Sequence, residues 1–272
     1  MKSTLSWSIY KHFSQKRAFG FTFLDVLREF PGWNREYLAR ILGYMVKEQM
    51  LYKIAHNLYH IIPAESDPKS YLPEPLQIAK YFSLQESYYI GYSKALEIHG
   101  LSPPTGNSVA VVTVKQVKQG SREVGGIRCD YIHHNSNRFF GFENFWINPV
   151  EQAMVSDLEK TIVDVSTKPI YCGGIVELGK AMLKAKKKTD YSKLCYYFAR
   201  NGNTPAKKRY LYLTELLGLQ WNRSLDQMQK ELGETIALLD RTAPYQGKTS
   251  SKFALKINVD PIRIRREILQ LQ

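Results

Sequence analysis

The chain has 272 residues and a mass of 31.4 kDa, which suits about two domains better than one small module. Its composition, 44% hydrophobic and 23% charged, is that of a protein with packed cores, so disorder is excluded for most of its length. The 38 Lys and Arg residues outnumber the 25 Asp and Glu residues, and the net charge of +13 makes a polyanion the first partner to consider.

The sequence shows no signal for a membrane, a metal or a cofactor. No apolar run approaches the ~20 residues that span a bilayer, and the amino terminus lacks the apolar segment of a signal peptide. The three cysteines are widely spaced, without a CxxC pair, and the six histidines show no HExxH spacing. We therefore expect a cytoplasmic protein with no membrane partner, no metal and no cofactor.

Proline marks the clearest break in the chain. Four of the twelve prolines fall within residues 63–75, where they fix φ and remove hydrogen-bond donors. Residues 63–76 are therefore predicted to be a semi-rigid linker between a front domain, residues 1–62, and a larger domain, residues 77–272.

The front domain has the element order of a winged helix-turn-helix. Helices are predicted from Thr4 to about Arg17, from Phe23 to Phe30 and from Asn34 to about Gln49; a Thr22–Asp25 capping box starts the second helix and Asn34 caps the third. The segment LYKIAHNLYHII, residues 51–62, alternates around Ala55-His56-Asn57 and indicates a β-hairpin. Three helices and a hairpin in this order predict a DNA-binding fold.

The third helix has two distinct faces. Leu38, Ile41, Leu42 and Met45 recur at the spacing of a buried stripe, whereas Glu36, Arg40, Gly43 and Lys47 lie opposite. A helix with basic residues on its exposed face fits the major groove of DNA, and the hairpin contacts phosphates. The predicted DNA-binding residues are Asn34, Arg35, Arg40, Lys47, Lys53, His56 and Asn57. Small winged helices also serve as protein-protein modules, which leaves that alternative open.

The second domain is predicted to be a larger mixed α/β domain, so the fold class is α+β. A helix over residues 84–101 ends at Gly100, and strands over residues 109–114, 126–132 and 138–147 form a small antiparallel sheet. Asn148 and Pro149 predict a helix that continues to about Ser166. Further helices are predicted near residues 174–187, 190–200, 204–218 and 224–239.

Two polar surfaces stand out in that domain. Asp157, Lys160, Thr161 and Asp164 share one face of the helix predicted to end at Ser166, where they form either structural ion pairs or an interaction surface. Residues 180–210 carry ten basic residues and one acid, a local net charge of +9, whereas residues 1–70 carry only +4. The candidates for phosphate contacts in this basic segment are Lys184, Lys186, Lys187, Lys188, Lys207, Lys208 and Arg209.

Four segments carry a resemblance to a known family. They are YYIGYSKALEIHGL (residues 88–101), RFFGF (138–142), SDLEKTIVD (156–164) and KPIYCGGI (168–175). In this order, behind a winged-helix front, they resemble the AbiEi antitoxins, the transcriptional regulators of the AbiE toxin-antitoxin systems of abortive infection. The likeness covers nearly the whole chain.

The resemblance implies a repressor whose winged helix binds double-stranded DNA at inverted repeats in its own promoter. It further implies that the second domain counters a cognate nucleotidyltransferase toxin without a stable complex between the two proteins. The second-domain positions implied to matter are Tyr89, His99, Gly100, Asp157, Glu159, Lys160, Asp164, Tyr171, Gly173 and Gly174. His99, at a predicted helix end, suits a capping or packing role better than that of a base.

An enzymatic function fits the residues poorly. A metal-dependent nuclease needs paired carboxylates, but Asp157 and Glu159 point about 200° apart on a helix and no Glu-x-Lys triplet occurs. Asp157-Leu158-Glu159 also lacks the preceding Gly-Ser of a nucleotidyltransferase. We therefore expect no enzyme and no catalytic residue, which leaves two hypotheses: a DNA-binding autorepressor with an antitoxin domain, or a winged-helix protein-interaction adaptor without specific DNA binding.

Overall fold

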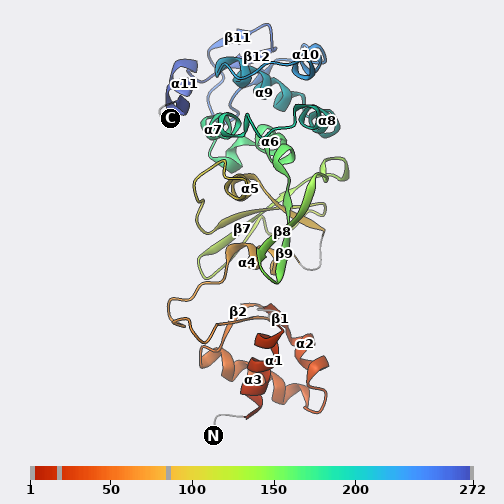
Figure 1. The fold of residues 1–272 in the computed structure, drawn as a ribbon, viewed down its shortest axis with the longest axis vertical. Helices are drawn as coiled ribbons and strands as arrows, with labels where there is room; N and C mark the ends of the chain where they lie inside the picture. The colour runs from red at the N-terminus through yellow and green to blue at the C-terminus, as the bar shows by residue number, and fades with distance from the viewer. Residues whose placement is uncertain (1–3, 17–19, 84–86, 270–272) are drawn as a thin grey trace. The chain divides into compact units, whose positions relative to one another are not determined.

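The protein is an α+β fold, seen in a computed structural model that describes residues 4–16, 20–83 and 87–269 (Figure 1). The chain forms two compact units, each assembled from separate segments. Unit 1 comprises residues 1–86, 121–129 and 145–153, and unit 2 comprises residues 87–120, 130–144 and 154–272. The predicted fold class is confirmed, while the linear boundaries of the two domains and their linker stay a prediction.

Unit 1 begins with a winged helix. Its elements are α1 (Thr4–Gln15), β1 (Gly20–Thr22), α2 (Phe23–Glu29), α3 (Arg35–Lys47), β2 (Leu51–Ala55) and β3 (Leu58–Ile61). The three strands form a sheet in the order β1-β3-β2, with β3 antiparallel to both neighbours. The predicted helices and hairpin are confirmed, although the end predicted at Arg17 lies outside the described residues. Strand β1 was not predicted, because three residues are too few to show alternation.

Local side-chain chemistry fixes the helix starts in this winged helix. The Asp25 backbone N–H donates to Thr22 Oγ1 at 3.2 Å, and the Thr22 backbone N–H donates to Asp25 Oδ2 at 2.7 Å, so the capping box of α2 is complete. The Tyr37 backbone N–H donates to Asn34 Oδ1 at 2.8 Å and caps α3. Because both helices start at fixed residues, the buried stripe of α3 meets the same core as α1 and α2.

The remainder of unit 1 contains a buried carboxylate that anchors a helix. Helix α4 (Pro75–Phe82) places Gln77 and Tyr81 against Glu151, which begins strand β9 (Glu151–Ser156). The Tyr81 hydroxyl donates to Glu151 Oε1 at 2.8 Å, and Lys80 Nζ lies 3.6 Å from the same oxygen. A buried carboxylate with several donors is stable in place, so α4 is fixed to the start of β9.

A six-stranded sheet follows in the chain. Its other strands are β4 (Tyr88–Gly91), β5 (Ser108–Thr113), β6 (Ser121–Val124), β7 (Ile127–His133) and β8 (Phe142–Asn148). The strand order is β6-β7-β5-β4-β9-β8. Strand β4 is antiparallel to β5 and parallel to β9, so the sheet is mixed and larger than the three predicted strands.

The single helix predicted over residues 84–101 is wrong. Residues 84–86 lie outside the described part, Tyr88–Gly91 is strand β4, and only Tyr92–Ile98 is helical, as α5. Tyr92 has φ 54°, a left-handed turn that separates the strand from the helix. The spacing of the aromatic and β-branched residues in this segment is compatible with a helix or a strand. Tyr88–Gly91 forms a strand because it pairs with β5 and β9.

The helix predicted to start at Asn148 is also wrong in its first half. Asn148 Oδ1 accepts hydrogen bonds from the backbone N–H groups of Val150 and Glu151, both at 3.0 Å. The same Asn chemistry that caps a helix here closes the turn between β8 and β9. The helix, α6 (Leu158–Thr167), starts instead at Asp157, whose Oδ1 accepts from the Lys160 backbone N–H at 2.8 Å.

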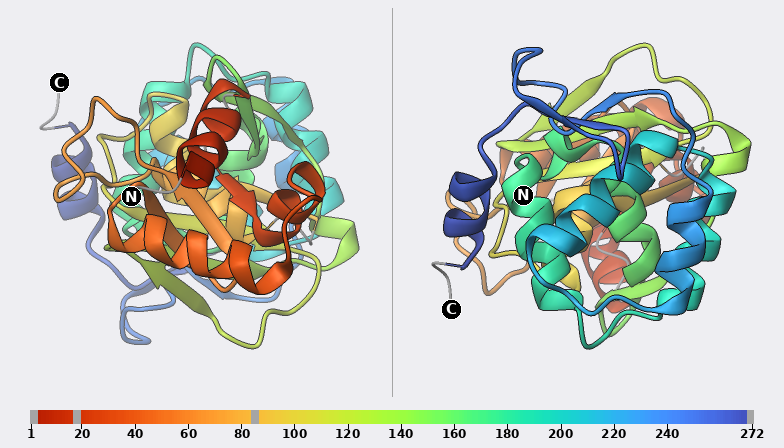
Figure 2. Two further views of the ribbon diagram at one scale, coloured as in Figure 1. Left: turned by 90° about the horizontal axis from the view of Figure 1, so that it is seen from below. Right: turned by 90° about the horizontal axis from the view of Figure 1, so that it is seen from above.

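Helix α6 is the centre of the helical part of unit 2. It packs against α5, α7 (Ile175–Ala185), α8 (Tyr191–Asn201) and α9 (Thr204–Leu216), and the right-hand view of Figure 2 shows it in green among them. The face of α6 that carries Lys160, Thr161 and Asp164 is buried, since each of the three is 0% exposed. Of the two alternatives for this face, the structural ion pair is confirmed for Lys160 and Asp164, and an interaction surface at these three residues is wrong because other helices pack around α6.

The last elements complete unit 2. They are α10 (Arg223–Lys230), β10 (Ala237–Leu238), β11 (Lys248–Ser250), β12 (Leu255–Ile257) and α11 (Pro261–Leu269), with 3-10 turns at Ser136–Arg138 and Pro169–Cys172. The helix predicted to reach residue 239 ends at Lys230, and the chain continues into a small sheet of order β10-β12-β11. The other predicted carboxy-terminal helices are confirmed within a few residues.

Candidate nucleic-acid interface

Helix α3 presents a basic face opposite its core. The predicted stripe, Leu38, Ile41, Leu42 and Met45, is buried, whereas Arg40, Gly43 and Lys47 are exposed. A Cβ built on Gly43 would meet no atom within 4 Å, so no other side chain covers the helix backbone between the two cations. The left-hand view of Figure 2 shows α3 in orange, in front of the winged-helix strands.

Aromatic rings support the cations near the start of α3. The guanidinium of Arg40 lies 5.6 Å from the centre of the Tyr37 ring, and the Trp33 ring stacks on Tyr37 at 5.2 Å. The guanidinium of Arg35 lies 5.4 Å from the Phe23 ring. Such contacts limit the rotamers of an exposed arginine. Trp33, which is 47% exposed, was not among the predicted DNA-binding residues. Its position directly after the Pro31-Gly32 turn was the one feature of the sequence that could have pointed to it.

The hairpin of β2 and β3, here called the wing, is fixed against the helices. Lys53, His56 and Asn57 are exposed, and Asn57 has φ 58°, the left-handed conformation that its turn requires. The carbonyl of Asn57 accepts a hydrogen bond from the Phe23 backbone N–H at 2.9 Å. This bond joins the tip of the wing to the start of α2, so the cations on the wing and on α3 have a defined spacing.

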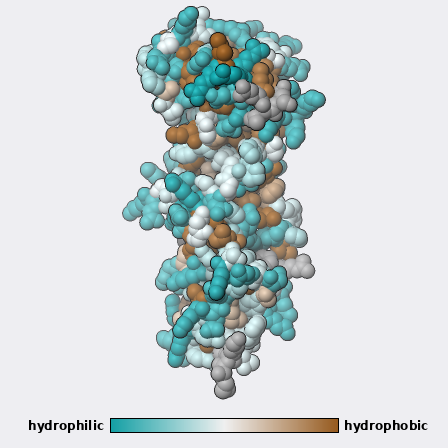
Figure 3. Space-filling view, turned by 90° about the vertical axis from the view of Figure 1, so that its left-hand side faces the viewer, coloured by the Kyte–Doolittle hydropathy of each residue, from teal (hydrophilic) through white to brown (hydrophobic). Residues whose placement is uncertain are grey.

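In the part of the chain that the structure describes, the cations of α3 and the wing form no ion pair, unlike cations on the neighbouring helices. Lys16 pairs with Glu29 at 2.8 Å, and Arg28 pairs with Asp25. Within the described parts of the chain, by contrast, no carboxylate forms an ion pair with any of four exposed cations: Arg35, Arg40, Lys47 and Lys53. Figure 3 shows one face of the molecule, on which the amino-terminal residues at the bottom are mostly hydrophilic.

The basic segment of residues 180–210 divides into surface and interior residues. Lys184, Lys186, Lys187 and Lys188 are exposed around the end of α7, and Lys207 pairs with Glu231 at 3.1 Å. Lys208 and Arg209 are buried, at 0% and 1% exposed, so their assignment to an exposed basic surface for a nucleic-acid backbone is wrong. Their donors bind backbone carbonyls of distant loops, a destination that spacing along one helix does not reveal.

The family-like motif residues of unit 2 meet in a buried polar network. Lys160 Nζ binds Asp164 Oδ1, and the Tyr89 hydroxyl donates to Asp164 Oδ2 at 2.8 Å. His134 joins two tyrosines, since its Nδ1 lies 3.1 Å from the Tyr89 hydroxyl and its Nε2 lies 3.0 Å from the Tyr92 hydroxyl. Burial lowers the pKa of His134 to about 4 and raises the pKa of Tyr89 well above its usual value. The network connects β4, α5 and α6 with His134, the residue after β7, and its members are buried.

A second, half-exposed cluster surrounds Lys193. Its ammonium lies 3.2 Å from Asp157 Oδ2 and 3.0 Å from Glu159 Oε2, and the Tyr197 hydroxyl donates to Asp157 at 2.9 Å. Burial lowers the pKa of Lys193, but hydrogen bonds to Glu159 and Asp157 outweigh burial and raise that pKa above its usual value. The two carboxylates therefore share a lysine that joins α8 to the start of α6. In the described part of the chain, no group of three or more His, Cys, Asp or Glu side chains is arranged to hold a metal ion.

The remaining motif residues occupy turns and helix ends. His99 Nε2 lies 2.8 Å from the Ser156 carbonyl, which supports the packing role expected for it. Gly100, Gly173 and Gly174 have φ of 71°, 94° and 97°, conformations that suit glycine. Tyr171 packs edge-on against Tyr92, with ring centres 5.3 Å apart.

Comparison with known proteins establishes the fold alone. A similar solved structure is that of the RV2827C protein from Mycobacterium tuberculosis, with a TM-score of 0.67 and 11% identity over 99% of this chain and 94% of that one. No family model matches the sequence, and no curated protein does. Within the described residues, no helix is long and apolar enough to cross a membrane.

Removing the partner of buried Lys160 tests whether the network supports the fold. We expect Asp164→Asn to lower the free energy of unfolding by about 3–5 kcal/mol, because a buried ammonium then lacks its counter-charge. Urea denaturation measures this change. Lys160→Met combined with Asp164→Asn should recover most of the loss. Glu177→Gln, which breaks the half-exposed pair with Lys180, is the control and should cost less than about 1 kcal/mol. If Asp164→Asn also lowered the free energy of unfolding by less than about 1 kcal/mol, the buried network would not support the fold.

Acid should destabilise the protein through His134. The unfolded chain binds a proton there below about pH 6.5, whereas the folded chain resists protonation until about pH 4. Stability therefore falls as the pH falls from 6.5 to 4, by up to about 3 kcal/mol from this residue. His134→Gln should flatten the dependence of unfolding free energy on pH, whereas His133→Gln, at an exposed neighbouring position, should leave it unchanged. If the unfolding free energy of the two variants depended equally on pH, His134 would not be the cause of the acid destabilisation.

Proposed function

We propose that this chain is a DNA-binding transcriptional autorepressor, with α3 as its recognition helix. The observation that carries the proposal is the set of four exposed cations on α3 and the wing that form no ion pair in the described ranges of the chain. An exposed cation that forms no ion pair in the described part of the chain is available to a phosphate or to a guanine edge, because no ion pair has to be broken first.

The dimensions of α3 suit the major groove. Thirteen residues give a helix of about 20 Å, and Arg40 and Lys47, two turns apart, are separated by about 10 Å along its axis. That distance corresponds to about three base pairs, and the groove is ~12 Å wide. Because Gly43 lies between the two cations, the helix backbone can approach the bases closely.

The cations divide into two roles in this proposal. Arg40 and Lys47 contact base edges in the groove and supply sequence preference. Arg35 near the start of α3 and Lys53 on the wing contact phosphates, together with the amide of Asn34 and the polar wing tip, His56 and Asn57. The exposed lysines of residues 184–188 add attraction for the backbone that carries no sequence information.

The antitoxin role rests on the resemblance to the AbiEi antitoxins. We propose that the protein belongs to a toxin-antitoxin system, binds inverted repeats in its own promoter as a cytoplasmic protein, and counters a nucleotidyltransferase toxin. The arrangement of Asp157, Glu159 and Lys160 in ion pairs supports a non-catalytic role, since each of these charges already has a partner.

A protein-interaction adaptor is the second candidate. Large apolar side chains are exposed on the winged helix, with Trp7 at 51%, Leu24 at 69% and Trp33 at 47%. Such residues favour protein contacts when they gather in one patch. The adaptor predicts a stable protein partner and no retardation of DNA at moderate salt.

DNA binding is tested with the region upstream of the gene. We expect the full chain to retard this duplex, with affinity that falls steeply with salt, and Arg40→Ala with Lys47→Ala to abolish preference over an unrelated duplex. Lys53→Ala should weaken binding to both duplexes and reduce the salt slope by about one. Fluorescence anisotropy over a range of salt concentrations measures both effects.

The control removes the same charge from paired positions. Lys16→Ala with Arg28→Ala deletes two cations that already have carboxylate partners, so sequence preference should persist. If the Arg40 and Lys47 double variant retains full preference, or if both double variants lose it equally, α3 is not the reading helix.

The antitoxin role is tested by co-expression with a nucleotidyltransferase toxin encoded beside this gene. We expect the full chain to restore growth, and the Arg40→Ala with Lys47→Ala variant to do so equally when both genes are under an unrelated promoter. Colony counts measure the rescue. An absence of any rescue by the wild-type chain would contradict the antitoxin role while leaving the DNA-binding proposal standing.

A further inference from the structure

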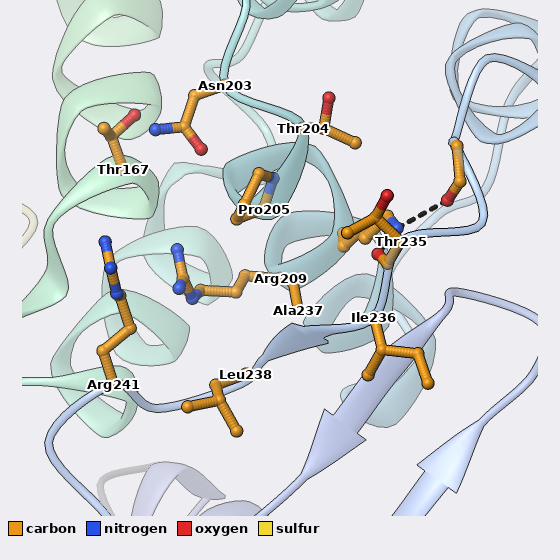
Figure 4. Close-up of a pocket in the computed structure, with 12 residues that line it drawn as sticks. Thr167, Asn203, Thr204, Pro205, Arg209, Thr235, Ile236, Ala237, Leu238 and Arg241 are labelled. Atoms are coloured by element: carbon orange, nitrogen blue, oxygen red, sulfur yellow. Dashed lines mark hydrogen bonds between the residues drawn. The ribbon is translucent and has the colours of Figure 1, made fainter.

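Unit 2 contains a pocket of about 540 Å³ beside the start of α9 (Figure 4). The end of α6 and the segment that carries β10 form its other walls. Such a volume is typical of sites for small organic ligands. The lining residues are Thr167, Asn203, Thr204, Pro205, Lys208, Arg209, Gly233, Thr235, Ile236, Ala237, Leu238 and Arg241.

The charge of this pocket is all of one sign. Its lining includes Lys208, Arg209 and Arg241 and no carboxylate. The neighbouring Asp240 is outside the lining, and its Oδ1 accepts from the Thr242 backbone N–H at 2.8 Å and from the Thr242 hydroxyl. A concave surface of this kind attracts an anion.

The three cations differ in what their donors do. Lys208 Nζ donates to the carbonyls of Gly233 and Thr235, both at 2.6 Å, so it holds the loop and contributes charge only. Arg209 donates from Nε to Leu239 O at 2.8 Å and from Nη1 to Ser166 O at 3.2 Å. Its Nη2 makes no hydrogen bond to any residue that the structure describes, although the side chain is 1% exposed.

The guanidinium groups of Arg209 and Arg241 converge. Figure 4 shows both directed to the same side of the pocket, toward Thr167 and Asn203. Arg241 is exposed and forms no ion pair with a carboxylate in the described ranges. Burial, and then the charge of Arg241, lower the pKa of Arg209 to about 10, an effect that Asp240 opposes. Two arginines that face one space without an acid between them match the oxygens of a phosphate, which accepts paired donors from each fork.

The rest of the pocket lining suits an organic group. Pro205, Ile236 and Leu238 provide apolar surface, and the hydroxyls of Thr204 and Thr235 provide hydrogen bonds. An inorganic phosphate alone would fill a small part of the volume. We infer that this pocket binds a small phosphorylated molecule of the nucleoside monophosphate class, with its phosphate between Arg209 and Arg241 and its ring against Ile236 and Leu238. This inference is independent of DNA binding by α3.

Isothermal titration calorimetry of the full chain with the four ribonucleoside monophosphates tests the pocket. We expect at least one to bind, and the matching nucleoside without phosphate, or inorganic phosphate alone, to bind at least roughly tenfold more weakly. Arg241→Ala should weaken nucleotide binding by roughly tenfold or more. Because Arg241 is exposed, this variant should retain the wild-type unfolding midpoint.

The matched control is Arg265→Ala, an exposed arginine of α11 outside the pocket, which should bind the nucleotide as the wild type does. Failure of all four nucleotides to bind at millimolar concentration would overturn the inference, as would equal affinity in Arg241→Ala and wild type. If Arg241→Ala weakens binding of a DNA duplex while no nucleotide binds, the pocket contacts DNA backbone instead and the small-ligand inference is wrong.

Discussion

A charge inside a protein costs several kcal/mol unless an opposite charge or several hydrogen bonds compensate it, and this cost organises the basic residues of the chain. Lys160 is fully buried at the centre of unit 2 and is compensated by Asp164, which also accepts from Tyr89. The burial of Lys160 among the helices around α6 is therefore favourable only while the charge of Asp164 lies beside it. Lys208 is compensated by loop carbonyls, and the position of those loops depends on it in turn.

The same criterion identifies the cations that are free to meet a partner. Arg35, Arg40, Lys47 and Lys53 are exposed and form no ion pair within the described residues, in contrast to Lys16 and Arg28. The net charge of +13 is therefore a poor guide to binding until each cation is placed. Part of the +9 of residues 180–210 stabilises the interior, and part lies at the surface as Lys184 to Lys188.

Predictions from sequence succeeded where the cause was local. The capping box of Thr22 and Asp25, the Asn34 cap and the buried stripe of α3 depend on residues a few positions apart, and the winged helix followed from them. Asn148 shows the limit of such reasoning, because one side-chain oxygen can cap a helix or close a turn and only pairing of β8 with β9 decides. Lys208 and Arg209 were placed wrongly for a related reason, since their carbonyl partners lie 25 or more residues away. Arg241 and its pocket depend on the same long-range folding, so no spacing pointed to them.

The central claim is that α3 enters DNA while the wing contacts its backbone. Hydrogen-deuterium exchange of the full chain, with and without its upstream duplex, measures this most directly. The account predicts slower exchange in residues 35–47 and at the wing, residues 53–57, when the duplex is bound. Unchanged exchange in both segments under conditions where the duplex is fully bound would contradict it.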